Sequence, residues 1–201
     1  MDFLMGMCCK DFVVVCADTN AQMSQILTIK HDEDKIVPID SHKVMALAGQ
    51  PGDRSQFSEF IIANVRLYAL RNSRRLSTHA VANFTRNELA TSLRKKPYNA
   101  NMLIAGYDES CGPSLYWMDY LATLHKTNVA GMGYGSYFAL SLFDRYAKVD
   151  MEEKEAVALM ARGVQEVISR ITVAPSDYVI KVVDKNGTRT VETISPGHVA
   201  K

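Results

Sequence analysis

The spacing of apolar residues along this chain changes in blocks, and the order of the blocks restricts the folds that the chain can adopt. Apolar runs and alternation typical of strands occupy the first third, the middle and the end. The two intervals between them carry the helical spacing of three to four residues. Blocks of strands separated by pairs of helices indicate an α+β protein built in layers instead of alternating βαβ units.

Turn and cap residues divide these blocks into elements. Lys10-Asp11 separates two apolar runs and predicts a hairpin, and Asn186-Gly187 between alternating apolar residues predicts another. Ser77 is a suitable N-cap for the second helix. The expected strands cover residues 3–9, 12–16, 25–30, 35–39, 43–48, 101–107, 115–120, 178–183 and 188–194, with 25–30 and 35–39 paired across residues 31–34; the expected helices cover residues 57–68, 77–95, 133–146 and 152–167.

Composition indicates one globular domain and excludes several functional classes. No repeat, low-complexity tract or linker appears, so we expect a single domain over residues 1–194 and a tail over residues 195–201. The net charge of +1 does not favour nucleic acid or an anionic membrane surface as a partner. No apolar run approaches the about 20 residues that cross a bilayer, and the start of the chain lacks the features of a signal peptide.

The sequence offers little that would bind a metal or a cofactor, and we expect neither. The five histidines form no HxxxH or HExxH pattern. The glycines at 131, 133 and 135 resemble a phosphate-binding loop only loosely, because the six-residue dinucleotide spacing is missing. A cysteine nucleophile is an open alternative, but Cys8, Cys9 and Cys16 lie in strand patterns, where a free thiol usually behaves as a small hydrophobe. With no CxxC pair and no secretory signal, we expect reduced thiols and a location in the cytoplasm and nucleus.

Four stretches of the chain form a distinctive set: residues 13–19, residues 45–53, residues 104–108 with 115–119, and residues 133–136 with Asp144-Arg145. In this order and at these spacings, they resemble the beta-type subunits of the 20S proteasome over nearly the whole chain. Within that family, residues 1–6, 52–57 and 82–86 resemble the non-catalytic subunit at the fourth position of the beta ring. The resemblance implies a four-layer αββα sandwich of the N-terminal nucleophile hydrolase type, which agrees with the block order.

The same resemblance implies what became of the catalytic site. Active members expose an N-terminal threonine whose hydroxyl attacks the peptide carbonyl while its own amine serves as the base. By resemblance, Asp18 and Lys35 stand where the family has a charged pair, and Gly49 stands where an amide stabilises the oxyanion. The nucleophile position falls at or beside Asp2, and the first threonine in the chain is Thr19. We therefore expect no catalytic residue and treat Asp18, Lys35 and Gly49 as vestigial; an ordinary salt bridge or unrelated surface charges are the alternatives.

Three further positions that support the threonine in active members are also changed. By resemblance, the family's serine falls at Tyr134, its second aspartate at about Ile171 and its last serine at about Ala174. Ile171 and Ala174 cannot accept a hydrogen bond through their side chains, and Tyr134 is far larger than serine.

The expected function is that of a non-catalytic structural subunit, which takes part in assembly and walls the chamber for ATP/ubiquitin-dependent protein degradation. The resemblance implies contacts with the beta subunits at the third and fifth positions, with alpha-ring subunits and with the opposite beta ring, and an unprocessed N-terminus at Met1. Two alternatives stay open. One is an active N-terminal nucleophile hydrolase with a processed N-terminus, and the other is a free-standing binding module.

Overall fold

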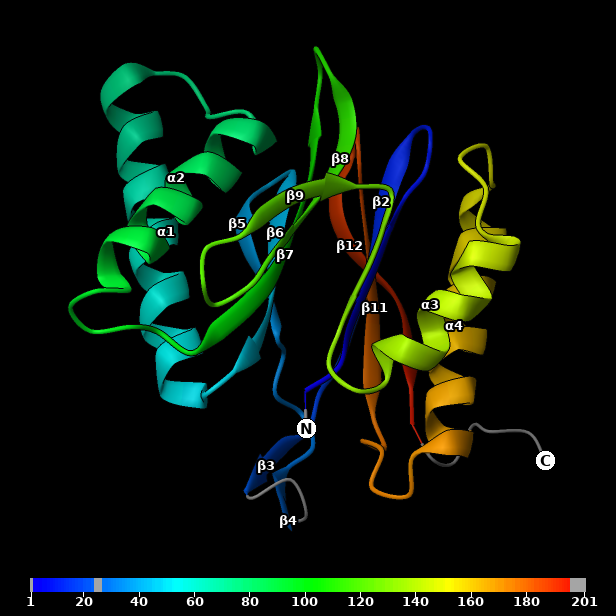
Figure 1. Cartoon of the computed structure of the whole chain (residues 1–201). Coiled ribbons are helices and arrows are strands. Elements are labelled where there is room, and N and C mark those ends of the chain that lie inside the picture. Colours follow the sequence, from blue (N-terminus) through cyan, green and yellow to red (C-terminus); the bar gives the residue numbers. More distant parts are fainter. Residues whose placement is uncertain (1, 24–26, 196–201) are drawn as a thin grey trace.

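Two five-stranded sheets pack face to face, and a pair of helices covers the outer face of each sheet. The computed structural model describes residues 2–23 and 27–195. Figure 1 shows the layers in order across the molecule: α1 with α2, the sheet that contains β5 to β9, the sheet that contains β1 and β2, and α3 with α4. The expected αββα sandwich is confirmed.

The first sheet is entirely antiparallel and has the strand order β10-β1-β2-β11-β12. Both expected hairpins are confirmed: β1 pairs with β2 across Lys10-Asp11, and β11 pairs with β12 beside Asn186-Gly187. Its strands are β1 (Leu4–Cys8), β2 (Phe12–Asp18), β10 (Val129–Met132), β11 (Tyr178–Asp184) and β12 (Gly187–Ile194).

The second sheet is also antiparallel, with the strand order β5-β6-β7-β8-β9. The helices α1 and α2 lie in sequence between β6 and β7, so the chain leaves this sheet, covers it and returns to it. Its strands are β5 (Ile36–Asp40), β6 (Lys43–Gly49), β7 (Ala100–Asp108), β8 (Gly112–Met118) and β9 (Leu124–Thr127); the helices are α1 (Pro51–Asn72), α2 (Thr78–Ser92), α3 (Ser136–Tyr146) and α4 (Glu153–Arg170).

Strand β2 shows how the sequence produces the layers. Val13, Val15 and Ala17 point into the core between the two sheets, while Val14 and Cys16 point into the core beneath α3 and α4. All five side chains are buried. A strand covered on both faces reads as a continuous apolar run, and burial of each valine contributes about 1.5–3 kcal/mol before entropy costs.

Residues at the starts of three helices supply local caps or, in α1, a proline suited to the first turn. Ser77 Oγ accepts a hydrogen bond from the Ala80 amide at 3.2 Å, which confirms the expected N-cap of α2. Glu152 and Glu155 form a capping box at the start of α4. Pro51 begins α1, six residues before the expected start at residue 57, and its missing N–H removes no helical hydrogen bond.

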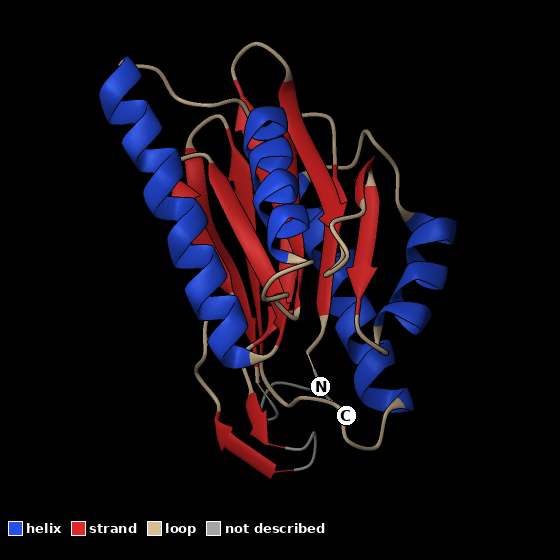
Figure 2. Cartoon of the chain, turned by 60° about the vertical axis from the view of Figure 1, so that its left-hand side comes forward, coloured by secondary structure: helices blue, strands red, loops and turns tan. Residues whose placement is uncertain are grey.

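One expected pairing is wrong, and three strands were not expected. Strand β4 (Leu27–Lys30) pairs with β3 (Ala21–Met23) in a separate hairpin, whereas β5 pairs with β6. Both cartoons show this hairpin extending away from the sandwich (Figures 1 and 2). The short strands β3, β9 and β10 were not expected. Residues 25 and 26 of the expected strand and residues 196–201 of the expected tail lie outside the described residues, so the division into a domain and a tail stays a prediction.

Candidate functional site

Four residues that lie far apart in the sequence meet at one end of the sandwich. Asp2 precedes β1 and Asp18 ends β2 in the first sheet, whereas Lys35 precedes β5 and Gly49 ends β6 in the second. We call these four residues the Lys35 cluster. The structure thus brings together every residue that the sequence assigned to the vestigial site and its lost nucleophile, while their vestigial role stays a prediction.

Lys35 holds the cluster together. Its Nζ donates to Asp2 Oδ1 at 2.5 Å, to Asp18 Oδ2 at 2.6 Å and to the backbone oxygen of Asn20 at 2.9 Å. The side chains of Lys35 and Asp18 are both 0% exposed, so they are not surface charges. The three acceptors match the three donors of the ammonium group, so the buried cation is fully hydrogen-bonded.

The carboxylate of Asp2 joins the two sheets. One oxygen accepts from Lys35, and the other accepts from the Gly49 amide at 2.7 Å. The Asp2 side chain is 19% exposed, which places it at the outer edge of the cluster. A carboxylate with one oxygen on an ammonium and the other on a backbone N–H is held in a single orientation by charge-assisted hydrogen bonds.

The position of the Gly49 amide depends on glycine. Its φ is +128°, a backbone conformation that side chains disfavour. A Cβ at this position would lie 2.1 Å from the backbone oxygen of Asn99. The turn from β6 into α1 therefore points this amide at Asp2 only while residue 49 lacks a side chain.

Asp18 receives two backbone amides in addition to Lys35. The Phe3 N–H donates to Asp18 Oδ1 at 2.7 Å, and the Asn20 N–H donates to Asp18 Oδ2 at 3.3 Å. The roles of Phe3 and Asn20 could not be predicted from the sequence. Both residues act through backbone atoms, and a pattern of side chains carries no information about these. Their amides fix the start of β1 and the end of β2 around one carboxylate.

Comparison with known proteins identifies the family. The family model described as "Proteasome subunit" matches residues 3–183. The chain belongs to the proteasome beta-subunit family.

Several curated proteasome subunits are similar to this chain over nearly its whole length. Proteasome subunit beta type-2 of Oryza sativa subsp. japonica is 53% identical over 189 residues, which cover 94% of this chain and 89% of the relative. The beta type-2 subunit of Dictyostelium discoideum is 44% identical, covering 98% and 100%. The beta type-4 subunit of Saccharomyces cerevisiae is 37% identical, covering 96% and 98%. As a member of this family, the chain is a beta subunit of the 20S core and assembles with other proteasome subunits.

The three residues that the resemblance places at support positions show no hydrogen bond to the Lys35 cluster in the described part of the chain. Tyr134 is 64% exposed, and Ile171 and Ala174 are half-buried against the core beneath α3 and α4. Where the resemblance places hydroxyl and carboxylate groups, this member has one exposed phenol and two apolar side chains.

The glycine-rich segment has a structural role at the same place. Gly133 has a φ of +82°, and a Cβ there would lie 2.1 Å from the backbone oxygen of Asp2. The chain can therefore pass directly over residue 2 only with glycine at this position. Close packing against the start of β1 accounts for this glycine without a phosphate ligand.

The pKa values of the two carboxyl groups in the cluster are shifted in opposite directions. Burial acts to raise the pKa of Asp2, but Lys35 and the Gly49 amide outweigh it and lower the pKa below its ordinary value. Burial prevails for Asp18 and raises its pKa despite Lys35, and the negative charge of Asp2 adds to that rise. Two carboxylates share one ammonium, and Asp2 is the more acidic of them.

Neither the cysteines nor Thr19 is poised to act as a nucleophile at the Lys35 cluster. Burial raises the pKa of Cys9 to about 12 and raises the pKa values of Cys8 and Cys16 as well, which opposes thiolate formation. Thr19 Oγ1 donates to the backbone oxygen of His31 at 2.7 Å.

Within residues 2–23 and 27–195, no group of three or more His, Cys, Asp or Glu side chains is arranged to hold a metal ion. In the same residues, no helix has the length and apolar character required to span a membrane.

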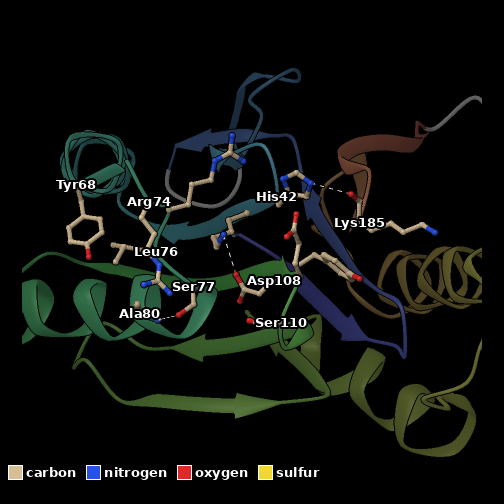
Figure 3. Close-up of a pocket in the computed structure, with 13 residues that line it drawn as sticks. His42, Tyr68, Arg74, Leu76, Ser77, Ala80, Asp108, Ser110 and Lys185 are labelled. Carbon is tan, nitrogen blue, oxygen red and sulfur yellow. Dashed lines mark hydrogen bonds and ion pairs between the residues drawn. The ribbon is translucent and has the colours of Figure 1, made fainter. Parts of the chain in front are cut away.

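Two cavities lie at opposite ends of β6. One, of about 450 Å³, is lined by Asp2, Gly49 and Gly133 among others. The other, of about 780 Å³, surrounds the start of β6 and is shown in Figure 3. There Lys43 Nζ lies 3.3 Å from an oxygen of Asp108, so the buried ammonium of that cavity is already paired within the fold. The first cavity opens onto the Lys35 cluster and is the candidate site.

Proposed function

We propose that this chain is a non-catalytic structural subunit of the 20S proteasome, which completes the beta ring and walls the chamber for ubiquitin-dependent protein degradation. The observation that carries the proposal is the Asp2 carboxylate, bound by Lys35 and by the Gly49 amide. An ionised carboxylate has no proton to give and cannot act as a hydroxyl nucleophile. It also occupies the amide that would stabilise a developing oxyanion.

The proposal includes a place in the particle. The resemblance of residues 1–6, 52–57 and 82–86 supports the fourth position of the beta ring, between the subunits at the third and fifth positions. Contacts with alpha-ring subunits and with the opposite beta ring belong to the same proposal. So does a location in the cytoplasm and nucleus.

An active hydrolase with a processed N-terminus is the second candidate, and strand β1 weighs against it. Processing at Cys8 or Cys9 would remove most or all of β1, which lies between β10 and β2 in the first sheet. The side chains of Leu4 and Met5 are 0% exposed, so their loss would open both cores of that sheet.

Native mass spectrometry and cross-linking of the particle from its source test the structural role. We expect this chain inside the 20S particle, with cross-links to the neighbours at the third and fifth positions. We also expect no labelling of this chain by an electrophilic threonine-directed probe that labels the active subunits. A chain found outside the particle as a stable monomer would support a binding module instead, and labelling would support the hydrolase.

Restoring a threonine tests whether the site is lost beyond one residue. The variant replaces Asp2 by Thr and is produced so that this threonine is the first residue, with a free amine. Because Tyr134, Ile171 and Ala174 supply no support, we expect no peptide hydrolysis from this subunit in particles whose active subunits are inactivated. Groups that act as a unit recover little activity when one is returned alone. Turnover together with probe labelling of residue 2 would contradict the proposal for the support positions.

A further inference from the structure

Lys35 and Gly49 form a receptor for a carboxylate. The ammonium group approaches one oxygen of Asp2 at 2.5 Å, and the amide approaches the other oxygen at 2.7 Å. Such paired donors would hold any carboxylate of suitable access, because they contact only the two oxygens.

We infer that Asp2 is an intramolecular ligand of this carboxylate receptor, and that its side chain keeps the free carboxylates of peptides out of it. The inference rests on the proposed function in one respect, since a subunit that walls the chamber is exposed to peptide products, each of which ends in a carboxylate.

The receptor does not depend on Asp2 for its shape. Lys35 is also held by Asp18 and by the backbone oxygen of Asn20. The Gly49 amide is fixed by its turn, in which the Gln50 N–H donates to the backbone oxygen of Asn99 at 3.0 Å. Removal of the Asp2 side chain therefore leaves both donors near their present positions.

The receptor is reachable from solvent. The Asp2 side chain is 19% exposed and lines the cavity of about 450 Å³ that also borders Gly49. This volume lies within the roughly 300–1,000 Å³ of typical ligand pockets. Without the side chain, the two donors would face a cavity large enough for the carboxylate end of a peptide.

Charge and proximity explain why the internal ligand prevails. With Asp2 in place, the cluster carries two carboxylates on one ammonium. After removal of the Asp2 side chain, a bound peptide carboxylate would restore the same charge. The Asp2 carboxylate is attached to the fold, so its effective concentration exceeds that of a free peptide terminus.

The test uses the full-length chain with Asp2→Gly, and with Asp2→Asn as the matched control. The glycine variant empties the receptor, whereas asparagine fills the same volume with a neutral amide. The probes are sodium acetate against sodium chloride at equal pH and ionic strength, and an acetylated tripeptide with a free carboxylate against its C-terminal amide. The measurement is the midpoint of thermal unfolding, which rises with ligand concentration when a ligand binds the folded state alone.

We expect acetate and the tripeptide acid to raise the midpoint of Asp2→Gly in proportion to the logarithm of concentration, and the tripeptide amide to have no effect. The wild-type chain and Asp2→Asn should respond equally to acetate and chloride. If Asp2→Gly folds only in acetate, the receptor is confirmed in a stronger form. Equal responses of all three proteins, or a failure of Asp2→Gly to fold in either salt, would overturn the inference.

Maps of the assembled particle containing Asp2→Gly provide a second measurement. Density that joins Lys35 Nζ to the Gly49 amide in acetate, and that is absent in chloride, is the expected result. Empty donors in both salts would contradict the receptor. Incorporation into particles is scored separately, so a failed receptor and a failed structural role are distinguishable.

Discussion

Lys35 is the residue on which the site depends, because its single positive charge lies between two carboxylates. Both the ammonium and Asp18 are fully buried. Such a group adds little net stability while it is paired, but removal of the cation leaves carboxylates in the interior without compensation.

We expect Lys35→Met to lower the free energy of unfolding by roughly 3–5 kcal/mol, the range found when one partner of a buried pair is removed. The matched control is Lys30→Met, whose ammonium lies 3.4 Å from Asp32 with both side chains more than half exposed (57% and 83%). That control should show no measurable change. Urea unfolding of the refolded chain measures both variants, and equal stabilities would show that the cluster tolerates an unpaired Asp2 and Asp18.

The lowered pKa of Asp2 predicts a pH-dependent contribution to stability. A carboxyl whose pKa is lower in the folded chain stabilises the fold above its ordinary pKa, and this contribution is lost as the pH falls through the folded value. The difference in free energy of unfolding between the wild-type chain and Asp2→Asn should therefore be largest near neutral pH and shrink below about pH 4.

Asp32→Asn is the control for that series. The Asp32 side chain is 83% exposed, so the difference from wild type should stay small at every pH. A wild-type advantage over Asp2→Asn that grows as the pH falls would show that the direction of the Asp2 shift is wrong.

Sequence reasoning located the side chains of this site better than its backbone contacts. Asp18, Lys35 and Gly49 could be placed because the family resemblance fixes their positions relative to strand ends. The acceptor on Asn20 and the donor on Phe3 could not be placed, because every residue has these groups and only the folded path decides which of them meet.

At the scale of elements, the predictable strands are those with distinctive burial. Strand β2 is buried along its whole length and gives an unbroken apolar run. Strand β4 is different, since Leu27 and Ile29 are 62% and 64% exposed on a hairpin outside the sandwich. Apolar spacing shows that such a segment can form a strand but not which strand it pairs with. The prediction that this segment pairs with β5 is therefore wrong, and β4 pairs with β3. Strands β9 and β10 have only four residues each, too few for a period to be recognised.

The turn between β6 and α1 predicts a contrast between two neighbouring glycines. Gly49→Ala should lower the free energy of unfolding by roughly 2–4 kcal/mol, because the new Cβ meets the Asn99 oxygen in a disfavoured conformation. Gly52→Ala, in the first turn of α1 with nothing within 4 Å of its Cβ position, should be neutral or stabilise by up to about 1 kcal/mol. Urea unfolding of both variants checks the contrast, and equal effects would contradict the account of Gly49.

At the scale of the whole molecule, large apolar side chains stay in contact with solvent in several layers. They include Leu70 at 80%, Tyr137 at 76%, Ile29 at 64% and Leu27 at 62% exposure, on α1, α3 and β4. In a subunit that assembles with other proteasome subunits, we expect neighbouring subunits to cover these side chains. The layer order could be predicted from sequence, but these contacts could not, because complementarity is a property of two surfaces.

The isolated chain should therefore self-associate. Sedimentation velocity of the recombinant chain at micromolar concentration is expected to show a broad, concentration-dependent distribution, and co-assembly with its neighbours should remove it. A sharp monomer boundary across the same concentrations would contradict the assignment of these surfaces to subunit contacts.

Different interactions join the two sheets at the two ends of the sandwich. At the Lys35 end, buried charges cross from one sheet to the other. At the opposite end, the Thr188 amide donates to the Ser41 oxygen at 3.0 Å and the His42 ring lies 3.2 Å from the Lys185 oxygen, with Ser41 and Lys185 both exposed to water. Water can replace the second set of bonds far more easily than the first. We therefore expect thermal opening of the subunit to begin at the Ser41 end of the sandwich, where exposed hydrogen bonds join the two sheets, and not at the Lys35 end.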